Sequence, residues 1–160
     1  MKQIAVVVAL VALSAGAYAQ GHTHVMAKLS DAQWGPAPPF VPAGAQLAVL
    51  SGDPTKPVPY SVRLKFPANY AIPAHSHPTD ENVVVVSGAV TFGAGDKLVK
   101  GAASNKTLGV GGYMLVGVGM NHFAYTGASE ATIVLYGMGP VDFKYVNPSD
   151  DPRNGKTATR

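Results

Sequence analysis

Short segments of alternating apolar and polar residues, each closed by a turn that contains glycine or proline, follow one another along most of this sequence. The clearest is YSVRLKF, residues 60–66, whose apolar members are Tyr60, Val62, Leu64 and Phe66. Because successive side chains of a strand point to opposite faces, this segment predicts a strand with one buried side. Eighteen glycines and 13 prolines supply the turns, and no segment has a convincing helical period.

The rest of the chain continues this pattern. A longer strand is predicted over VVVVSGAVTFG, buried on both faces at first and turned near Ser87-Gly88. Shorter strands are predicted over QLAVLSG, KLVKG, SNKTLGVGG, YMLVGVG, HFAYTG and ATIVLYGMG. Roughly nine short strands in about 100 residues predict an all-β fold, which is an antiparallel sandwich, a barrel or a jelly roll.

The first 19 residues have the pattern of a secretory signal peptide. Lys2 precedes an apolar run from Ile4 to Leu13, and Ala17-Tyr18-Ala19 matches the A-x-A cleavage pattern. The apolar run is too short to span a bilayer comfortably, which favours cleavage over an uncleaved membrane anchor. We therefore expect a bacterial protein that begins at Gln20, is periplasmic or secreted, and has no membrane attachment after cleavage.

Composition divides the remaining chain into three parts. Residues 20–44 are rich in proline, and we expect them to run extended over the surface or onto a neighbour. Residues 45–146 hold the predicted strands and are expected to form one barrel domain. Residues 147–160 are polar and are expected to form a flexible tail.

His22 and His24 lie close to the predicted cleavage point. A free amine at Gln20, two backbone amides and the imidazole of His22 could form a square-planar site for Cu(II) or Ni(II). A mobile chain end without such a role is the favoured interpretation of these two histidines.

Charge and cysteine content exclude several classes of protein. The formal net charge of +3 and the pI near 9.2 reflect few acidic residues, while the lysines are scattered and no arginine cluster occurs. Nucleic-acid binding therefore has little support. With no cysteine, the chain has neither a thiolate zinc site nor a cysteine nucleophile.

The segment PAHSHPTDENVVVVSG, residues 73–88, places two histidines and a glutamate at the start of the most apolar predicted strand. His75 and His77 are two apart, so on a strand both imidazoles point to one side. Pro78 then bends the chain, and Glu81 brings a carboxylate back to the same place. Imidazole with carboxylate suits zinc, iron, manganese, nickel or copper. An isolated H-x-H pair would fit two solvated loop histidines better.

A second segment with a histidine at the start of a predicted strand favours a metal site over solvated loop histidines. GGYMLVGVGMNHFAYTG, residues 111–127, places His122 after a glycine-rich turn at the mouth of another predicted strand. The two stretches together resemble the two motifs of the cupin superfamily. The first, G-x5-H-x-H-x3,4-E-x6-G, is matched by His75, His77, Glu81 and Gly88, with Asn69 in place of the leading glycine. The second, G-x5-P-x-G-x2-H-x3-N, is matched by Gly111, Gly119 and His122, with Gly117 and Thr126 in place of the usual proline and asparagine.

This resemblance covers roughly residues 45–138 and is nearest to small exported bacterial single-domain cupins. It implies a jelly-roll barrel that holds one divalent transition metal ion (Fe, Mn, Ni, Zn or Cu). The implied metal ligands are His75, His77, Glu81 and His122, and Glu81 is also the implied catalytic proton acceptor. Homodimers are common for such barrels, so a homodimer is expected as well.

The resemblance also implies a function. A metal ion in such a barrel indicates a metal-dependent enzyme, with an oxygenase, dioxygenase or oxidase acting on a small organic acid, diketone or phenolic compound ahead of an isomerase. The alternative is a non-catalytic periplasmic protein that binds or senses a small molecule or a metal, because the fold alone does not choose between these functions.

Overall fold

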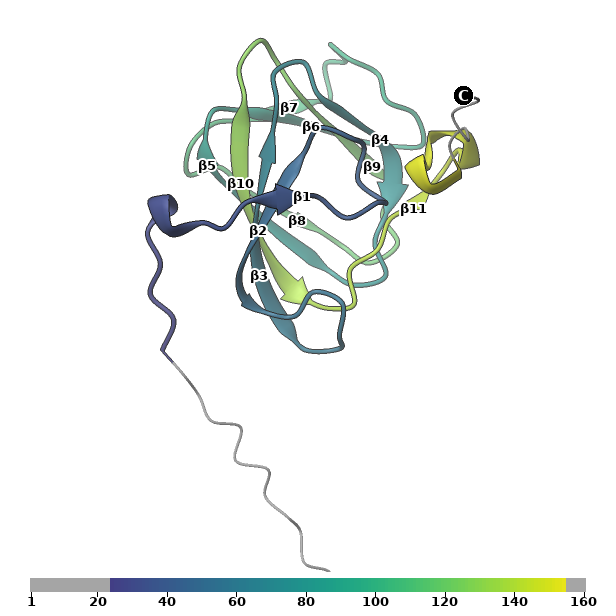
Figure 1. Ribbon diagram of the computed structural model, residues 1–160. Coiled ribbons are helices and arrows are strands. Elements are labelled where there is room, and N and C mark those ends of the chain that lie inside the picture. Colours follow the sequence, from purple (N-terminus) through teal and green to yellow (C-terminus); the bar gives the residue numbers. More distant parts are fainter. Residues whose placement is uncertain (1–23, 155–160) are drawn as a thin grey trace, which may run out of the picture.

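Two antiparallel β-sheets make up this computed structural model, which describes residues 24–154 (Figure 1). Three short 3-10 turns flank the strands, and no α-helix occurs within the described range. The all-β prediction is therefore confirmed. The strands are β1 (Gly35–Pro36), β2 (Gln46–Gly52), β3 (Pro59–Phe66), β4 (Ala71–Ser76), β5 (Glu81–Ser87), β6 (Val90–Ala94), β7 (Lys106–Leu108), β8 (Tyr113–Val116), β9 (His122–Thr126), β10 (Ala131–Met138) and β11 (Lys144–Tyr145).

From β3 onward the chain passes back and forth between the two sheets. The first sheet has the order β1-β2-β3-β10-β5-β8, and the second has the order β11-β4-β9-β6-β7. Strands β4, β6 and β9 therefore lie in one sheet while their sequence neighbours β3, β5 and β10 lie in the other. This alternation is the strand pattern of a jelly roll, and it encloses an apolar core between the sheets.

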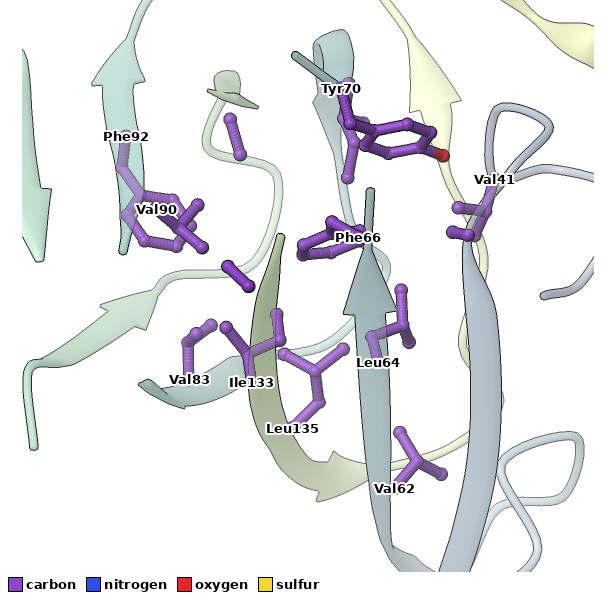
Figure 2. Close-up of a cluster of buried hydrophobic side chains, with 14 of the residues drawn as sticks. Val41, Val62, Leu64, Phe66, Tyr70, Val83, Val90, Phe92, Ile133 and Leu135 are labelled. Atoms are coloured by element: carbon purple, nitrogen blue, oxygen red, sulfur yellow. The ribbon is translucent and has the colours of Figure 1, made fainter. Parts of the chain in front are cut away.

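The inward faces of the strands supply that core. The predicted face of β3 is confirmed: its four apolar residues are buried, while Ser61, Arg63 and Lys65 on its other face are half-buried. Side chains from β3, β5, β6 and β10 meet between the sheets (Figure 2). The residues labelled there are Val41, Val62, Leu64, Phe66, Tyr70, Val83, Val90, Phe92, Ile133 and Leu135.

The valine-rich segment turns at Ser87-Gly88 as predicted, but its first part, β5, has one buried face, where burial on both faces was predicted. Val83 and Val85 are buried, whereas Val84 is half-buried and Val86 is exposed, because only one side of β5 faces the other sheet. A turn at Gly88 separates β5 from β6, and a Cβ there would lie 2.2 Å from the carbonyl oxygen of Glu130. The residue has a φ of +67°, so both its conformation and its surroundings require glycine.

The prediction of a strand over KLVKG is wrong. Residues 97–101 form a loop between β6 and β7, with no strand partner. Side chains hold this loop: the hydroxyl of Tyr125 accepts a hydrogen bond from the Gly101 N–H, and the Asn105 amide donates to the Val99 carbonyl. A short apolar pair without a buried face is therefore insufficient to form a strand here.

Asn69 and Thr126 replace the glycine and the asparagine that are usual at these motif positions, and both stabilise the turn before β4. Asn69, at the place of the leading glycine, is the one non-glycine residue with positive φ (56°) in residues 24–154. Asparagine tolerates this left-handed conformation. The Asn69 N–H donates to the Gly127 carbonyl, while the Thr126 hydroxyl donates to Pro67 and accepts from the Tyr70 N–H. The turn before β4 therefore forms with asparagine at position 69 and threonine at position 126.

The segment before the barrel lies partly against it. β1 pairs with β2, and Val41 and Ala45 are buried. The predicted signal peptide (residues 1–19) and His22 lie outside the described residues, and His24 is exposed. Within the described range, the structure contains no helix long and apolar enough to cross a membrane.

The chain after β11 differs from the expected flexible tail at its beginning. Residues Pro148–Asp150 and Pro152–Asn154 form the 3-10 turns η2 and η3. The guanidinium of Arg153 donates hydrogen bonds to the carboxylates of Asp142 and Asp151 and to the carbonyl of Phe143. These contacts attach the first part of the predicted tail to the barrel.

Candidate metal centre

The four predicted ligands converge from both sheets at one end of the barrel. His75 on β4 and His122 on β9 are direct cross-strand partners, and His77 follows just after β4. Glu81 is the first residue of β5 in the other sheet. All four side chains are buried, with exposed fractions of 1% for His75, 4% for His77, 8% for His122 and 7% for Glu81.

The three histidines form the tightest group. One potential ligand atom from each lies within 4.8 Å of the others, and the ring centroids of His75 and His122 are 4.3 Å apart. Glu81 is not part of this histidine group, but its Oε2 lies 3.4 Å from Nε2 of His77. The structure thus brings together all four predicted residues, while the role of each as a ligand stays a prediction.

Backbone carbonyls face the Nδ1 atom of every histidine in the cluster. Because a carbonyl oxygen can only accept, each of these contacts places the proton on Nδ1 and leaves the lone pair on Nε2. That is the arrangement by which proteins orient metal-binding imidazoles. The pairs are His75 with Pro73 (2.7 Å), His77 with Asp142 (3.2 Å) and His122 with Met120 (3.2 Å).

Two buried polar atoms of the cluster, Nε2 of His77 and Oε1 of Glu81, have no hydrogen-bond partner among the described residues; the third such atom is Nε of Arg63 on β3. Buried polar atoms are nearly always bonded, so both atoms lack an expected partner. Ligand atoms about 2.0–2.2 Å from a transition metal lie roughly 3–3.5 Å from one another. The separation of 3.4 Å between Nε2 of His77 and Oε2 of Glu81 falls in this range. The residues present therefore fit a divalent transition metal ion.

Burial also keeps the imidazoles neutral. Burial first, and then the neighbouring His122 and His77, together lower the pKa of His75 to about 2. The pKa values of His77 and His122 are lowered for the same principal reason, which is burial. Metal ions bind the neutral imidazole, so this environment maintains the form that a metal requires.

The carboxyl group of Glu81 is shifted in the opposite direction. Burial raises its pKa to about 7, although His122 opposes this shift. Without a cation nearby, Glu81 is therefore close to the midpoint of its titration at neutral pH. A cation beside it would favour the carboxylate.

An apolar cavity of about 90 Å³ lies against Glu81 inside the barrel. Its walls come mainly from β3 and the segment before β2, and they include Phe40 and Val62, while Leu135 is contributed by β10. A second void of about 30 Å³ is lined by His75, His122 and again Glu81. Glu81 thus lines both the histidine end and the apolar part of the barrel interior.

Tyr60 also lines this cavity and brings a hydroxyl group to it. The sequence predicts only that Tyr60 lies on the buried face of its strand. Gly137 pairs with Tyr60 on one side and with Glu81 on the other, so the three residues form one row across β3, β10 and β5. Burial raises the pKa of Tyr60 above its usual value, and the charge of Glu81 raises it further. Tyr60 is therefore a neutral phenol that can donate a hydrogen bond. Finding it required the strand register, which spacing along the chain does not give.

Phe143 also belongs to the centre and carries no signal in the sequence. Its ring stacks on His75 with centroids 4.0 Å apart and planes at 22°. It meets His77 edge-on at 4.9 Å. The ring covers two of the three imidazoles and helps to exclude water from them.

A groove of about 430 Å³ reaches His122 from outside the barrel. It lies between β8 and the strands β6 and β7, and its lining is largely apolar, including Phe92, Met114 and Val116. This groove is a candidate route from solvent to the histidine cluster.

Comparisons with known proteins agree with this architecture. The family model described as "Domain of unknown function (DUF4437)" matches residues 25–157. No curated protein matches the sequence significantly.

Similar solved structures identify the type of fold. The polyketide cyclase RemF from Streptomyces resistomycificus is similar with a TM-score of 0.65 and 16% identity, covering 81% of this chain and 90% of RemF. An RmlC-like cupin from Shewanella frigidimarina NCIMB 400 has a TM-score of 0.54 and 14% identity, covering 71% of this chain and 89% of that one. The DMSP lyase DddQ from Ruegeria pomeroyi DSS-3 has a TM-score of 0.52 and 20% identity, covering 69% of this chain and 57% of DddQ. The jelly roll is thus a cupin fold, as the motifs predicted.

Proposed function

We propose that this chain, which belongs to the DUF4437 family and has the cupin fold, binds one divalent transition metal ion and acts as an enzyme on a small organic molecule in the barrel cavity. The proposed ligands are the three histidines of the cluster and Glu81. The observation that carries the proposal is the pair of buried, unpartnered atoms, His77 Nε2 and Glu81 Oε1, beside imidazoles whose Nδ1 atoms all face carbonyls.

Oxygenase or oxidase chemistry is the first reaction class that we propose, because a bound iron, manganese, nickel or copper ion would supply redox or Lewis-acid chemistry. The protein's part is to bind and orient the substrate in a dry cavity. Phe143 and the apolar walls exclude water, and the carboxylate oxygen of Glu81 that does not bind the metal can hold or accept a proton.

Proton transfer without oxidation, as in an isomerase or cyclase, is the second candidate. It is favoured by one observation: the carboxyl group of Glu81 lines the same cavity as the phenol of Tyr60. A carboxylate in contact with the substrate cavity can accept a proton and return it to another atom of the substrate. Two of the similar structures, a polyketide cyclase and a DMSP lyase, support an enzyme of this broader kind.

The cavity favours a neutral substrate. None of the described residues that line it is a lysine or arginine, and its single ionisable carboxyl group is that of Glu81. An organic acid would place a second carboxylate beside Glu81 without a basic side chain to pair with it. A diketone or phenolic compound would instead accept a hydrogen bond from Tyr60 and leave its apolar part against the walls.

A non-catalytic binding protein is the alternative, and the burial of the four candidate ligands is compatible with it. Export to the periplasm or beyond and assembly into a homodimer remain predictions. Mass spectrometry of the N-terminus of native protein would test cleavage after Ala19, and light scattering at micromolar concentration would test the dimer.

Elemental analysis of untagged protein from its native compartment tests the metal, with a His75→Ala/His122→Ala variant for comparison. About one equivalent of metal that the variant lacks would support the proposal. Loaded protein is then offered diketones and phenolic compounds while O2 uptake and deuterium incorporation from D2O are followed. O2 uptake supports the first reaction class and deuterium incorporation supports the second. Metal binding with neither activity supports the alternative, and an absence of metal overturns the proposal.

A further inference from the structure

Residues Asp142 and Phe143 contact two of the three histidines. The carbonyl oxygen of Asp142 lies 3.2 Å from Nδ1 of His77 and sets the tautomer of that ring. The ring of Phe143 stacks on His75 at 4.0 Å. The position of this dipeptide therefore determines how both imidazoles are oriented.

No strand holds the dipeptide in place. β10 ends at Met138 and β11 begins at Lys144, so residues 142 and 143 lie in the connection between them. The carbonyls that face the other two histidines have closer support from the main chain: Pro73 is within β4, and Met120 closes a turn by donating its N–H to Gly117.

The guanidinium of Arg153 supplies the missing support. Its NH1 donates to Oδ1 of Asp142 (2.8 Å), and its NH2 donates to the carbonyl of Phe143 (2.8 Å). The Asp151 carboxylate accepts from Nε and NH2 and so fixes the plane of the guanidinium. Arginine is suited to this task because its donors form a rigid planar fork, whereas lysine offers a single point charge.

We infer that Arg153 is a positioning residue of the metal centre, which acts through Asp142 and Phe143 on His77 and His75. The inference rests on the proposed metal-binding function. It assigns a role to η3, a turn within the part of the chain that the sequence predicts to be a flexible tail. Residues that orient metal ligands in this indirect way typically affect metal affinity by about 10–100-fold.

The first test measures Zn(II) and Co(II) affinity by competition with a chelator. Arg153→Gln should bind each metal about 10-fold more weakly than the unsubstituted protein and should change the visible spectrum of bound Co(II). Arg153→Lys should recover part of the affinity. Arg63→Gln is the matched control, because the side-chain hydrogen bond of Arg63 is to the Lys28 carbonyl, and Arg63 lies on the outward face of β3.

A second measurement follows the imidazole Nδ1–H protons of metal-free protein by NMR. In Arg153→Gln the proton of His77 should exchange faster and shift, while that of His122, which faces Met120, should not change. A purely structural role of η3 would instead lower unfolding stability without this selective effect.

The metal-affinity and NMR measurements distinguish a failure of the proposed metal-binding function from a failure of the positioning role of Arg153. If the unsubstituted protein binds no metal, the proposed function fails, and the NMR comparison still decides whether Arg153 orients His77. If metal affinity and the His77 proton are the same in Arg153→Gln and Arg63→Gln, the positioning role is overturned.

Discussion

Tyr60 and Glu81 lie on opposite sides of Gly137 in one row of the six-stranded sheet. Gly137 has no side chain to separate them, and a Cβ there would lie 3.7 Å from both Cε1 and the hydroxyl oxygen of Tyr60. The phenol and the carboxyl group therefore share the cavity because glycine stands between them.

Tyr60→Phe should weaken binding of a ligand with an oxygen function. Removing the hydroxyl removes one hydrogen bond, which is worth about 1 kcal/mol or roughly a fivefold loss of affinity. The affinities of phenol and toluene, measured by NMR titration, provide the comparison, since only phenol carries the oxygen. We expect weaker binding of phenol and unchanged binding of toluene and metal. An equal loss for both compounds would show that the change acts through packing instead.

Gly137→Ala should destabilise the fold. The added Cβ would lie 2.7 Å from the carbonyl oxygen of Asp80, which requires a backbone shift. Such overpacking costs about 1–3 kcal/mol in the free energy of unfolding. Urea denaturation measures the effect, with Gly109→Ala as control because nothing lies within 4 Å of a Cβ at that position. Equal stability of the two variants would contradict the close approach of the Asp80 carbonyl to Gly137.

His77→Ala should lose the metal and the stability that the metal provides. A ligand at 100 times its Kd stabilises the native state by about 2.7 kcal/mol, so metal addition should raise the Tm of the unsubstituted protein only. Calorimetry with and without a chelator checks this result. His24→Ala is the control, since His24 is exposed. A His77→Ala protein with full metal content would contradict the assignment.

Metal-free protein should become less stable as the pH falls below about 6.5. The folded-state pKa values of the three histidines are lowered, so their contribution is complete above the unfolded value of 6.5 and is lost as the pH falls towards the folded values. Glu81 acts oppositely: its raised pKa favours the folded state below 4.5, and that contribution is lost as the pH rises through about 7.

Three histidines outweigh one glutamate, so the net effect of acidification is a loss of stability. Urea midpoints of chelator-treated protein between about pH 7 and about pH 5 measure the slope. In Glu81→Gln the slope should be steeper, because the opposing group is gone. A midpoint that rises on acidification would rule out neutral buried histidines.

Asn69→Ala should destabilise the protein, whereas Asn69→Gly should not. The φ of 56° costs an alanine about 1 kcal/mol, while glycine adopts it freely. Unfolding midpoints of the two variants give the difference directly. Equal midpoints would mean that the turn before β4 relaxes to another conformation.

The sequence predicts that these residues come together because the relevant distances are local. His75, His77 and Glu81 lie within seven residues of one another, and the period of a strand determines how their side chains point. The one-sided burial of β3 follows from the same period. Motif spacing adds His122, which the fold then pairs with His75.

Other parts of the site depend on contacts between distant segments. Tyr60 meets Glu81 only through the register of β10 with its two neighbours. Phe143 contacts the histidines from the connection between β10 and β11, and Arg153 contacts Asp142 and Phe143 from a segment whose composition resembles a solvated tail. The segment KLVKG was predicted as a strand, but hydrogen bonds to the Tyr125 hydroxyl and from the Asn105 amide hold it as a loop.

The backbone carbonyls that orient the imidazoles bear on how such a site changes in evolution. An orienting aspartate or glutamate can be deleted by one codon change, but every amino acid has a carbonyl. At Pro73 and Met120 the acceptor therefore survives any substitution that leaves the chain path intact. The acceptor at Asp142 is also main chain, yet its position depends on one distant arginine codon. Of the three imidazoles, that of His77 is thus the one whose orientation a single substitution elsewhere in the chain, at Arg153, can most easily change.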